Sequence, residues 1–271
     1  MASKTELTSL ARELKNLHQR NFSYEKLETK WLSNNIHDMP KKTGVKNGEY
    51  DLGIQTDYVG LGVVYETRKI ITEVMNQPER LVEIARDSYV HKNGFVKLIL
   101  GQKDGRKKRL HYYPVGAKAD ENVHNHRWDL NSTILVGSLP SHFYKVDYDG
   151  DQDYLHAYRK NALTGEHEIV VTGKCTSTEV AYKAFTAGTN YTLPYYTHHR
   201  IGKVETPTVT LMRTNKPVSE ECDLINRIDR SGPGAEVEPP LSIKQVRFYL
   251  EEVVELLNME ICQLSNYNGG V

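Results

Sequence analysis

The pattern of hydrophobic and polar residues changes character near Asp87. Before that residue, hydrophobic side chains recur at three- and four-residue steps in residues 4–34 and again between Tyr65 and Asp87. This is the spacing of one face of an amphipathic helix. The segment Lys41–Gly53 between them is rich in Lys, Gly and Asn, which is typical of an exposed connection. Residues 1–88 are therefore predicted to form an N-terminal helical extension.

From residue 89 to residue 216 the chain follows a different pattern. Short runs rich in Val, Ile, Thr and Tyr alternate with turn residues at intervals of roughly ten, which predicts an antiparallel sandwich or barrel of eight or more strands. Asp104-Gly105 and Asp149-Gly150 fall between runs and suit tight turns. The expected strands are Phe95–Leu100, Arg109–Val115, Trp128–Val136, Ser141–Tyr148, Tyr154–Lys160, Glu168–Gly173, Val180–Thr186, Tyr191–Leu193 and Thr208–Arg213.

The last part of the chain, residues 217–271, combines a polar connection with one more helix. Ser231–Gly234 and Pro239-Pro240 are typical of a linker or surface loop. Residues 242–264 then place hydrophobic side chains at helical spacing, with Ser242 as the expected N-cap. We expect this C-terminal helix to pack on the barrel. The predicted fold class is mainly β, with α-helical extensions at both ends.

Composition narrows the classes of function. Lys plus Arg and Asp plus Glu each total 35, so the net charge is zero and no overall field attracts nucleic acid or an anionic membrane. The start of the chain has no apolar signal region, and no stretch approaches the roughly 18 apolar residues of a membrane span. A cytoplasmic location is expected. The three cysteines are widely spaced and odd in number, which argues against a disulfide framework and a thiolate zinc site.

The segments that indicate chemistry are rich in histidine. His124 and His126 lie two residues apart, and on a strand such residues point to the same face. A second segment, Gly188–Gly202, passes through Pro194 and reaches His198 and His199. Imidazole nitrogen is a good ligand for iron, zinc, nickel or copper. The sequence therefore predicts a metal site that combines the two segments.

These two segments resemble the paired signature motifs of the cupin superfamily. In that family His-x-His comes from the first motif, and a histidine five residues after a proline comes from the second, which selects His199 over His198. The resemblance covers roughly residues 95–215. It implies a cupin-type antiparallel β-barrel, a double-stranded β-helix, with a metal ion on His124, His126 and His199.

The chain departs from the family's first motif in an informative way. The motif's glutamate would fall at Leu130 or Asn131, so three histidines remain without a carboxylate. Such a site resembles the cysteine dioxygenase-like, or thiol dioxygenase, branch, whose third ligand lies in a segment similar to His199–Ile201. That branch's reactive cysteine is replaced by Asn131. Its Ser-His-Tyr relay would fall at Thr210, Met212 and Thr214, and its substrate arginine within residues 97–102, where the chain has no arginine. A true cysteine dioxygenase is not expected.

The resemblance implies a non-haem iron(II)-dependent oxygenase or dioxygenase. Its partners would be O₂ and a small polar, amino-acid-like metabolite that chelates the metal. Zn, Ni, Mn or Cu on the same ligands stays open, as does a redox-neutral isomerase, lyase or hydrolase, or a non-catalytic small-molecule-binding cupin. No nucleic-acid or membrane partner is expected, and base rates favour a homodimer.

Further site residues follow from their positions near these motifs. Strand alternation points either Arg109, His111 and Tyr113 or the intervening Tyr112 into the barrel, and the sequence leaves the choice open. Arg109 and Tyr112 are the candidates for catalysis. Arg109 and Arg213 are the candidate anchors for a carboxylate or phosphate. Tyr195 and Tyr196 are candidates for substrate binding at the entrance of the site, although aromatic packing explains them equally well. Asp129 is expected to face away from the metal and to pair with Arg127 or Arg200, and His198 is expected to pack or to support the ligands from behind. The sequence leaves open whether either residue binds the metal.

Overall fold

The computed structural model describes residues 45–46, 49–50, 52–60, 62–117, 122–160, 166–233 and 238–268. The helices predicted in residues 4–34 lie outside this part of the chain. The described helices are α3 (Gly62–Met75), α4 (Pro78–Asp87) and α5 (Ile243–Asn268).

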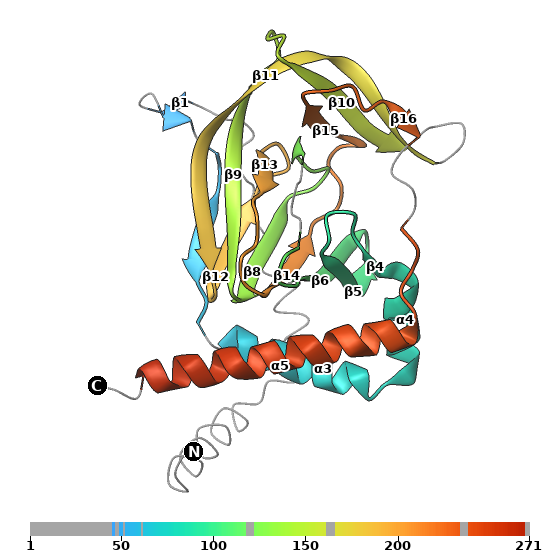
Figure 1. Cartoon of the computed structure of the whole chain (residues 1–271), viewed down its shortest axis with the longest axis vertical. Coiled ribbons are helices and arrows are strands. Elements are labelled where there is room, and N and C mark those ends of the chain that lie inside the picture. The colour runs from blue at the N-terminus through green and yellow to red at the C-terminus, as the bar shows by residue number, and fades with distance from the viewer. Residues whose placement is uncertain are drawn as a thin grey trace, which may run out of the picture. The chain divides into compact units, whose positions relative to one another are not determined.

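Two antiparallel sheets of seven strands each form the body of the described chain (Figure 1). The first sheet has the order β3-β12-β8-β14-β6-β5-β4, and the second has the order β10-β15-β7-β13-β9-β11-β16, with a further β10–β11 pairing. A two-stranded ribbon, β1 (Val45–Lys46) and β2 (Glu49–Tyr50), lies apart from both. The strands of the first sheet are β3 (Gln55–Tyr58), β4 (Tyr89–Val90), β5 (Val96–Lys103), β6 (Arg106–Tyr113), β8 (Leu130–Val136), β12 (Thr189–Leu193) and β14 (Thr208–Thr214). Those of the second are β7 (Val123–His124), β9 (Ser138–Asp147), β10 (Asp153–Lys160), β11 (His167–Thr186), β13 (His198–Ile201), β15 (Glu221–Asn226) and β16 (Gly232–Pro233).

The order in which the chain visits the sheets defines the fold. The strands β6, β7, β8 and β9 alternate between the sheets, and β11, β12, β13 and β14 alternate again after the excursion through β10. Four neighbours result in each sheet, β12-β8-β14-β6 in the first and β7-β13-β9-β11 in the second. This is the eight-stranded jelly-roll arrangement of the double-stranded β-helix. The predicted mainly β class with an antiparallel barrel is confirmed.

Side chains from both sheets meet in the barrel interior. Leu130 and Ile134 of β8 join Phe143 of β9 and Phe185 of β11 in one hydrophobic cluster, and each is at most 2% exposed. Because strand side chains alternate with period two, every second residue of β8 faces inward. Ser132 therefore lies on the inner face between Leu130 and Ile134.

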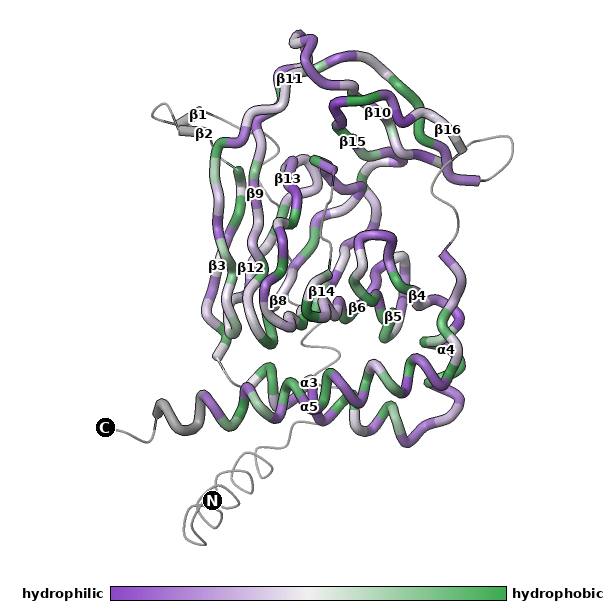
Figure 2. Tube along the Cα trace, viewed as in Figure 1, coloured by the Kyte–Doolittle hydropathy of each residue, from purple (hydrophilic) through white to green (hydrophobic). Residues whose placement is uncertain are grey.

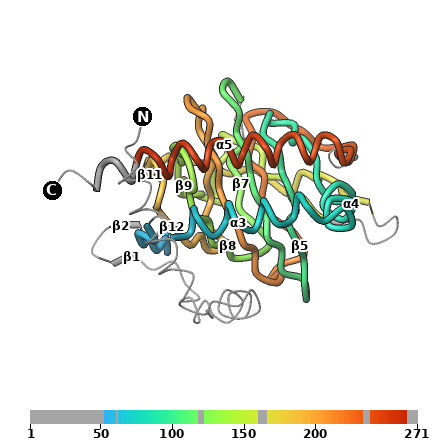
Figure 3. The backbone as a smooth tube through the Cα atoms, turned by 90° about the horizontal axis from the view of Figure 1, so that it is seen from below, coloured from blue at the N-terminus to red at the C-terminus, as the bar shows by residue number. Residues whose placement is uncertain are grey.

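Helices cover the outer face of the first sheet. The helices α3 and α5 run side by side across it (Figures 1 and 3), and Tyr249 of α5 meets Tyr112 of β6 with ring centroids 6.4 Å apart. Hydrophobic and hydrophilic residues alternate along both helices (Figure 2), as expected for helices that bury one face. Ser242 and Gln245 form the reciprocal hydrogen bonds of a capping box, so the predicted N-cap of α5 is confirmed.

The observed elements differ from the predicted ones at several boundaries. The single helix expected in Tyr65–Asp87 is two helices, because Pro78 cannot continue the first and instead begins the second. The two strands expected within Glu168–Thr186 form one long strand, β11, with a bulge. The sheets also extend beyond residues 89–216, through β3 on one side and β15 and β16 on the other. Among the described residues, the structure has no helix long and apolar enough to cross a membrane.

One glycine controls the corner where the chain passes from β8 to β9. Gly137 has a φ of +76°, and a Cβ atom there would meet the carbonyl of Pro207 and lie 2.6 Å from Thr208 Oγ1. We predict that Gly137→Ala lowers the free energy of unfolding by about 1 to 3 kcal/mol, because both the backbone conformation and the close approach exclude a side chain. Urea unfolding measures it. Gly173→Ala is the control, because nothing lies within 4 Å of its added Cβ, and equal losses in both variants would contradict the explanation.

Candidate metal centre

Three histidines converge inside the barrel, on the second sheet. His124 ends β7 and pairs directly with His199 of β13 in the antiparallel ladder, while His126 follows two residues after His124. One ring nitrogen of each lies within 4.8 Å of the others. The ring centroids are 4.5 to 5.0 Å apart. Nitrogens at these distances can share one metal ion at about 2.0 to 2.1 Å each.

His126 reaches this group by a route that strand alternation does not describe. The strand β7 ends at His124, so His126 lies in an irregular segment. Its backbone N–H donates to the carbonyl of Tyr195 at 3.0 Å. Its ring also stacks on Trp128, with centroids 6.0 Å apart and planes 14° apart. His124 and His126 therefore do face the same side, as expected. His126 is held there by the loop that follows Pro194 and by Trp128, not by a continuous strand.

The backbone orients two of the three rings. His124 Nδ1 lies 2.9 Å from the carbonyl oxygen of Asn122, and His199 Nδ1 lies 3.1 Å from that of Thr197. A carbonyl oxygen can only accept, so each Nδ1 carries the proton and donates it. In a neutral ring this leaves a lone pair on Nε2. The backbone thus selects the tautomer in which Nε2 can bind a metal.

Burial keeps the rings of His126 and His199 neutral. It lowers the pKa of His126 well below 6.5, and the neighbouring His199 and His124 lower it further. Burial likewise lowers the pKa of His199 well below its usual value, again with help from His124. A neutral imidazole is the form that binds metal, so these two ligands need not lose a proton near pH 7.

No carboxylate joins the three histidines within the described part of the chain. Asn131 occupies the position where the cupin motif has its glutamate. It lies between the inward-facing Leu130 and Ser132, so its own side chain faces outward. There its Nδ2 donates to Thr192 Oγ1 at 3.3 Å. Asp129 accepts the backbone N–H of Tyr195 at 2.9 Å and so anchors the loop before the third ligand. The group is an all-histidine site.

The inner face of the first sheet lies opposite this site. Phe95 contacts both His111 and Tyr113, with ring centroids 5.1 and 4.8 Å apart, and Tyr113 belongs to the interior cluster. Arg109 lies on the same face of β6, with Cζ 5.2 Å from the centroid of the Trp128 ring. The set Arg109, His111 and Tyr113 therefore faces inward, which resolves the alternative that the sequence left open.

Two of the predicted site residues lie elsewhere. Tyr112 points to the helical side, where burial and the neighbouring Glu252 and Tyr249 raise its pKa. The expectation that it acts beside the metal is therefore corrected: the helices, not the second sheet, cover its face of β6. Arg213 alternates with Met212, which packs against the interior cluster, so Arg213 projects from the other face of β14. The structure does not bring it to the three histidines.

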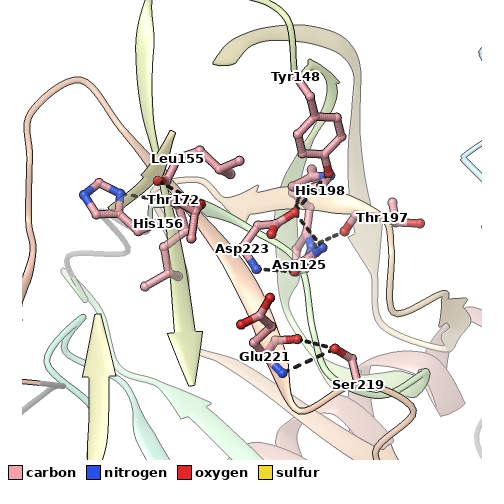
Figure 4. A network of polar contacts seen from close by, with 12 residues as sticks. Asn125, Tyr148, Leu155, His156, Thr172, Thr197, His198, Ser219, Glu221 and Asp223 are labelled. Atoms are coloured by element: carbon pink, nitrogen blue, oxygen red, sulfur yellow. Dashed lines mark hydrogen bonds and ion pairs between the residues drawn. The ribbon is translucent and has the colours of Figure 1, made fainter. Parts of the chain in front are cut away.

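The remaining predicted residues surround the third ligand. Tyr195 is 38% exposed and contacts Tyr196, with ring centroids 5.3 Å apart. The hydrogen bond from His126 to the Tyr195 carbonyl places this pair beside the histidines. His198 faces away from them and lies 2.8 Å from Asp223 through its Nε2 (Figure 4). Sequence reasoning did not find Asp223, its partner Asn125 or the role of Trp128, because only pairing between distant strands brings them together.

Comparisons with known proteins add limited information. No family model matches the chain, and no curated protein matches it. Among solved structures, an RmlC-like cupin from Shewanella frigidimarina NCIMB 400 is 16% identical, with a TM-score of 0.30 over 49% of this chain and 86% of that one. A hydroquinone 1,2-dioxygenase, PnpCD, in complex with Cd²⁺ and 4-hydroxybenzonitrile is 17% identical, with a TM-score of 0.30 over 51% and 72%. Streptomyces albus HEPD with Fe(II) bound is 9% identical, with a TM-score of 0.28 over 46% and 22%. Because these TM-scores are low, the fold is assigned from the strand order described above.

The buried histidines make the stability of the fold depend on pH. His91 stacks on Phe95 at 4.6 Å, and burial lowers its pKa to about 3. In the unfolded chain His91 binds a proton near pH 6.5, whereas in the folded chain it does not. The free energy of unfolding therefore decreases as the pH falls below about 6.5. We predict that His91→Phe reduces this loss by up to about 1.4 kcal/mol per pH unit between pH 6 and 4. Urea unfolding of the metal-free protein measures it, and an unchanged pH slope would contradict the assignment.

Proposed function

We propose that this chain is a metal-dependent enzyme of the cupin type, with a divalent transition metal on His124, His126 and His199. The observation that supports the proposal is the convergence of three imidazole nitrogens, one from each histidine, within 4.8 Å of one another. More specifically, we propose a non-haem iron(II)-dependent oxygenase that acts on a small polar, amino-acid-like anion which chelates the metal. The donor set fits such an ion, because imidazole is a favourable ligand for first-row transition metals and all three rings lie in the barrel interior.

An all-histidine site would determine the net charge at the metal where a substrate binds. Iron(II) held by three neutral ligands would keep its full positive charge and offer open positions to an anionic substrate and to O₂. The chain's own residues supply orientation and the exclusion of water. The backbone carbonyls of Asn122 and Thr197 hold two imidazoles in the required tautomer. The hydrophobic cluster around Phe143 closes the interior beside His199, with ring centroids 6.5 Å apart.

Arg109 supports the choice of an anionic substrate. Its side chain is in the interior, and the residue is only 9% exposed. Burial lowers its pKa to about 10, so the guanidinium remains charged at neutral pH. Its Nε has no hydrogen-bond partner among the described residues, although the ring of Trp128 lies 5.2 Å away. A buried charge is normally paired, so an arginine placed in this way suits a carboxylate of the substrate.

Other unsatisfied polar groups lie in the same region. Seven buried side-chain N or O atoms lack a partner within the described ranges, and four of them belong to Arg109, His111, Trp128 and Ser132. Arg109 and Ser132 both pair with Met212, on either side of it, so they share one row across the inner face. Three of the four groups are hydrogen-bond donors in any protonation state. Donors grouped in this way favour an acceptor-rich ligand, which an amino-acid-like carboxylate would be.

Metal analysis and oxygen consumption test the proposal together. We expect protein reconstituted anaerobically with Fe(II) to bind about one equivalent of the metal. His126→Ala and His199→Ala should each lower the affinity for Fe(II) by more than about 100-fold, which is the most that loss of a hydrogen-bond partner of a ligand typically causes. The wild type, but neither variant, should consume O₂ with a member of a panel of amino acids, thiols and amino-acid-derived metabolites. His142→Ala is the control, because it removes an imidazole from the outer face of the same sheet, where it pairs with Glu179. Absence of metal from the wild type would refute the proposal, and turnover under strict anaerobiosis would refute the oxygenase part alone.

A second prediction concerns the buried charge of Arg109. We expect Arg109→Met to raise the free energy of unfolding by about 1 to 4 kcal/mol, because an apolar side chain of similar size replaces a buried cation that has no ion-pair partner among the described residues. The same variant should lose turnover while keeping its metal. Arg106→Met, on the exposed end of the same strand, should change stability by less than about 0.5 kcal/mol. A destabilised, fully active Arg109→Met protein would show instead that the guanidinium has a structural role.

A further inference from the structure

The carboxylate of Asp223 lies behind the candidate metal centre, on the outer face of the second sheet. Asp223 belongs to β15, and its Oδ2 receives three hydrogen bonds (Figure 4). Asn125 Nδ2 lies at 3.1 Å, His198 Nε2 at 2.8 Å and the Tyr148 hydroxyl at 3.0 Å. These three donors come from three different parts of the chain. One oxygen atom therefore connects all of them to β15.

Two of these donors are direct neighbours of the candidate metal ligands. Asn125 lies between His124 and His126, and His198 immediately precedes His199. Along an extended chain, adjacent side chains point to opposite faces of a sheet. The histidines of the metal centre point into the barrel, whereas Asn125 and His198 point outward to Asp223. The carboxylate thus contacts both ligand-bearing segments from the side opposite to the metal.

The backbone alone holds these segments together weakly. The strand β7 has two residues, and its ladder with β13 consists of the pair His124 and His199. Its ladder with β15 has two pairs, Leu224 with His124 and Ile225 with Val123. Regular pairing ends at His124, so the ladders do not reach His126. Contacts beyond β7 must fix the second histidine of the His-x-His segment.

Asn125 and Asp223 provide such contacts at the point where the ladder ends. The backbone N–H of Asn125 donates to the carbonyl of Asp223 at 3.3 Å, and the backbone N–H of Asp223 donates to Asn125 Oδ1 at 2.7 Å. Together with the bond between the two side chains, three hydrogen bonds join this pair. The pair extends the β7–β15 connection by one residue. It fixes the backbone at Asn125, which is the residue between His124 and His126.

We propose that Asp223 is a positioning residue for the metal centre: by binding Asn125 and His198 through one oxygen, it fixes the distance between the two ligand-bearing segments and so sets the metal affinity. The inference depends on the proposed metal centre. It adds a determinant of affinity that does not touch the metal. His198 is only 5% exposed and the Asp223 side chain is 25% exposed, so the bond between them is partly buried and is stronger than a fully exposed contact.

The test compares three variants with the wild type in a titration of the metal-free protein with Co²⁺, followed by the visible absorption of the bound ion. We expect Asp223→Ala to weaken Co²⁺ binding by about 10- to 100-fold and to change the absorption spectrum, because the ligands are no longer held at one separation. Asp223→Asn should bind within about threefold of the wild type, because its amide oxygen can occupy the position of Oδ2. Glu221→Ala is the matched control. Glu221 lies two residues earlier on the same strand and pairs with Arg159 rather than with a ligand-bearing segment, so its replacement should leave binding unchanged.

Thermal unfolding of the metal-free proteins separates positioning from general stabilisation. We expect the loss of affinity in Asp223→Ala to persist under conditions where the metal-free variant is fully folded. If that variant does not fold, Asn125→Ala takes its place with the same expectation, since it breaks the same connection. Wild-type affinity and spectrum in a folded Asp223→Ala or Asn125→Ala protein would overturn the inference. So would an equal loss in Glu221→Ala. A wild type that binds no Co²⁺ would refute the metal centre itself, which is a different and distinguishable result.

Discussion

The pairing of His124 with His199 is the contact on which the candidate site depends. It joins two segments that are far apart in the chain, and it exists because the jelly-roll order places β7 beside β13. Every other feature of the site is arranged around this pair. His126 is added through the Tyr195 carbonyl and Trp128, and two backbone carbonyls fix the ring tautomers. A barrel with a different strand order would separate the same residues.

Charge is distributed unevenly around this pair. The side of the candidate metal centre consists of three histidines without a carboxylate, and the facing sheet contributes the buried cation of Arg109. Carboxylates of the neighbourhood lie outside the interior, with Asp223 behind the metal site and Asp129 on the backbone of Tyr195. With a divalent metal bound as proposed, the charges of the metal and of Arg109 would together favour anionic ligands. The same residues that could hold a metal therefore also define which ligands can approach it.

The sequence was sufficient for the fold class and the three histidines, but not for their surroundings. The spacing of His124 and His126 and the offset of His199 from Pro194 are local features that one chain displays directly. The face of β6 that turns inward depends on where α5 packs, so alternation alone could not choose between Arg109 and Tyr112. The strand β15 was missed because its residues, ECDLIN, lack a clear alternation. With that strand missing, Asp223 could not be connected to the ligand segments.

The helical cover on the first sheet has a consequence for how this protein can change. Leu98, Leu110 and Leu211 are at most 1% exposed and lie on the face that alternates away from Arg109, His111 and Met212, which is the face where Tyr112 meets Tyr249 of α5. On β6 and β14, one face thus buries leucines, whereas the inward face carries the polar groups of Arg109 and His111. The inward face also adds Tyr113 to the hydrophobic cluster, so it contributes to both packing and the proposed chemistry. Exchange of Arg109 or His111 therefore changes the ligand-facing surface while the leucines on the opposite face remain packed.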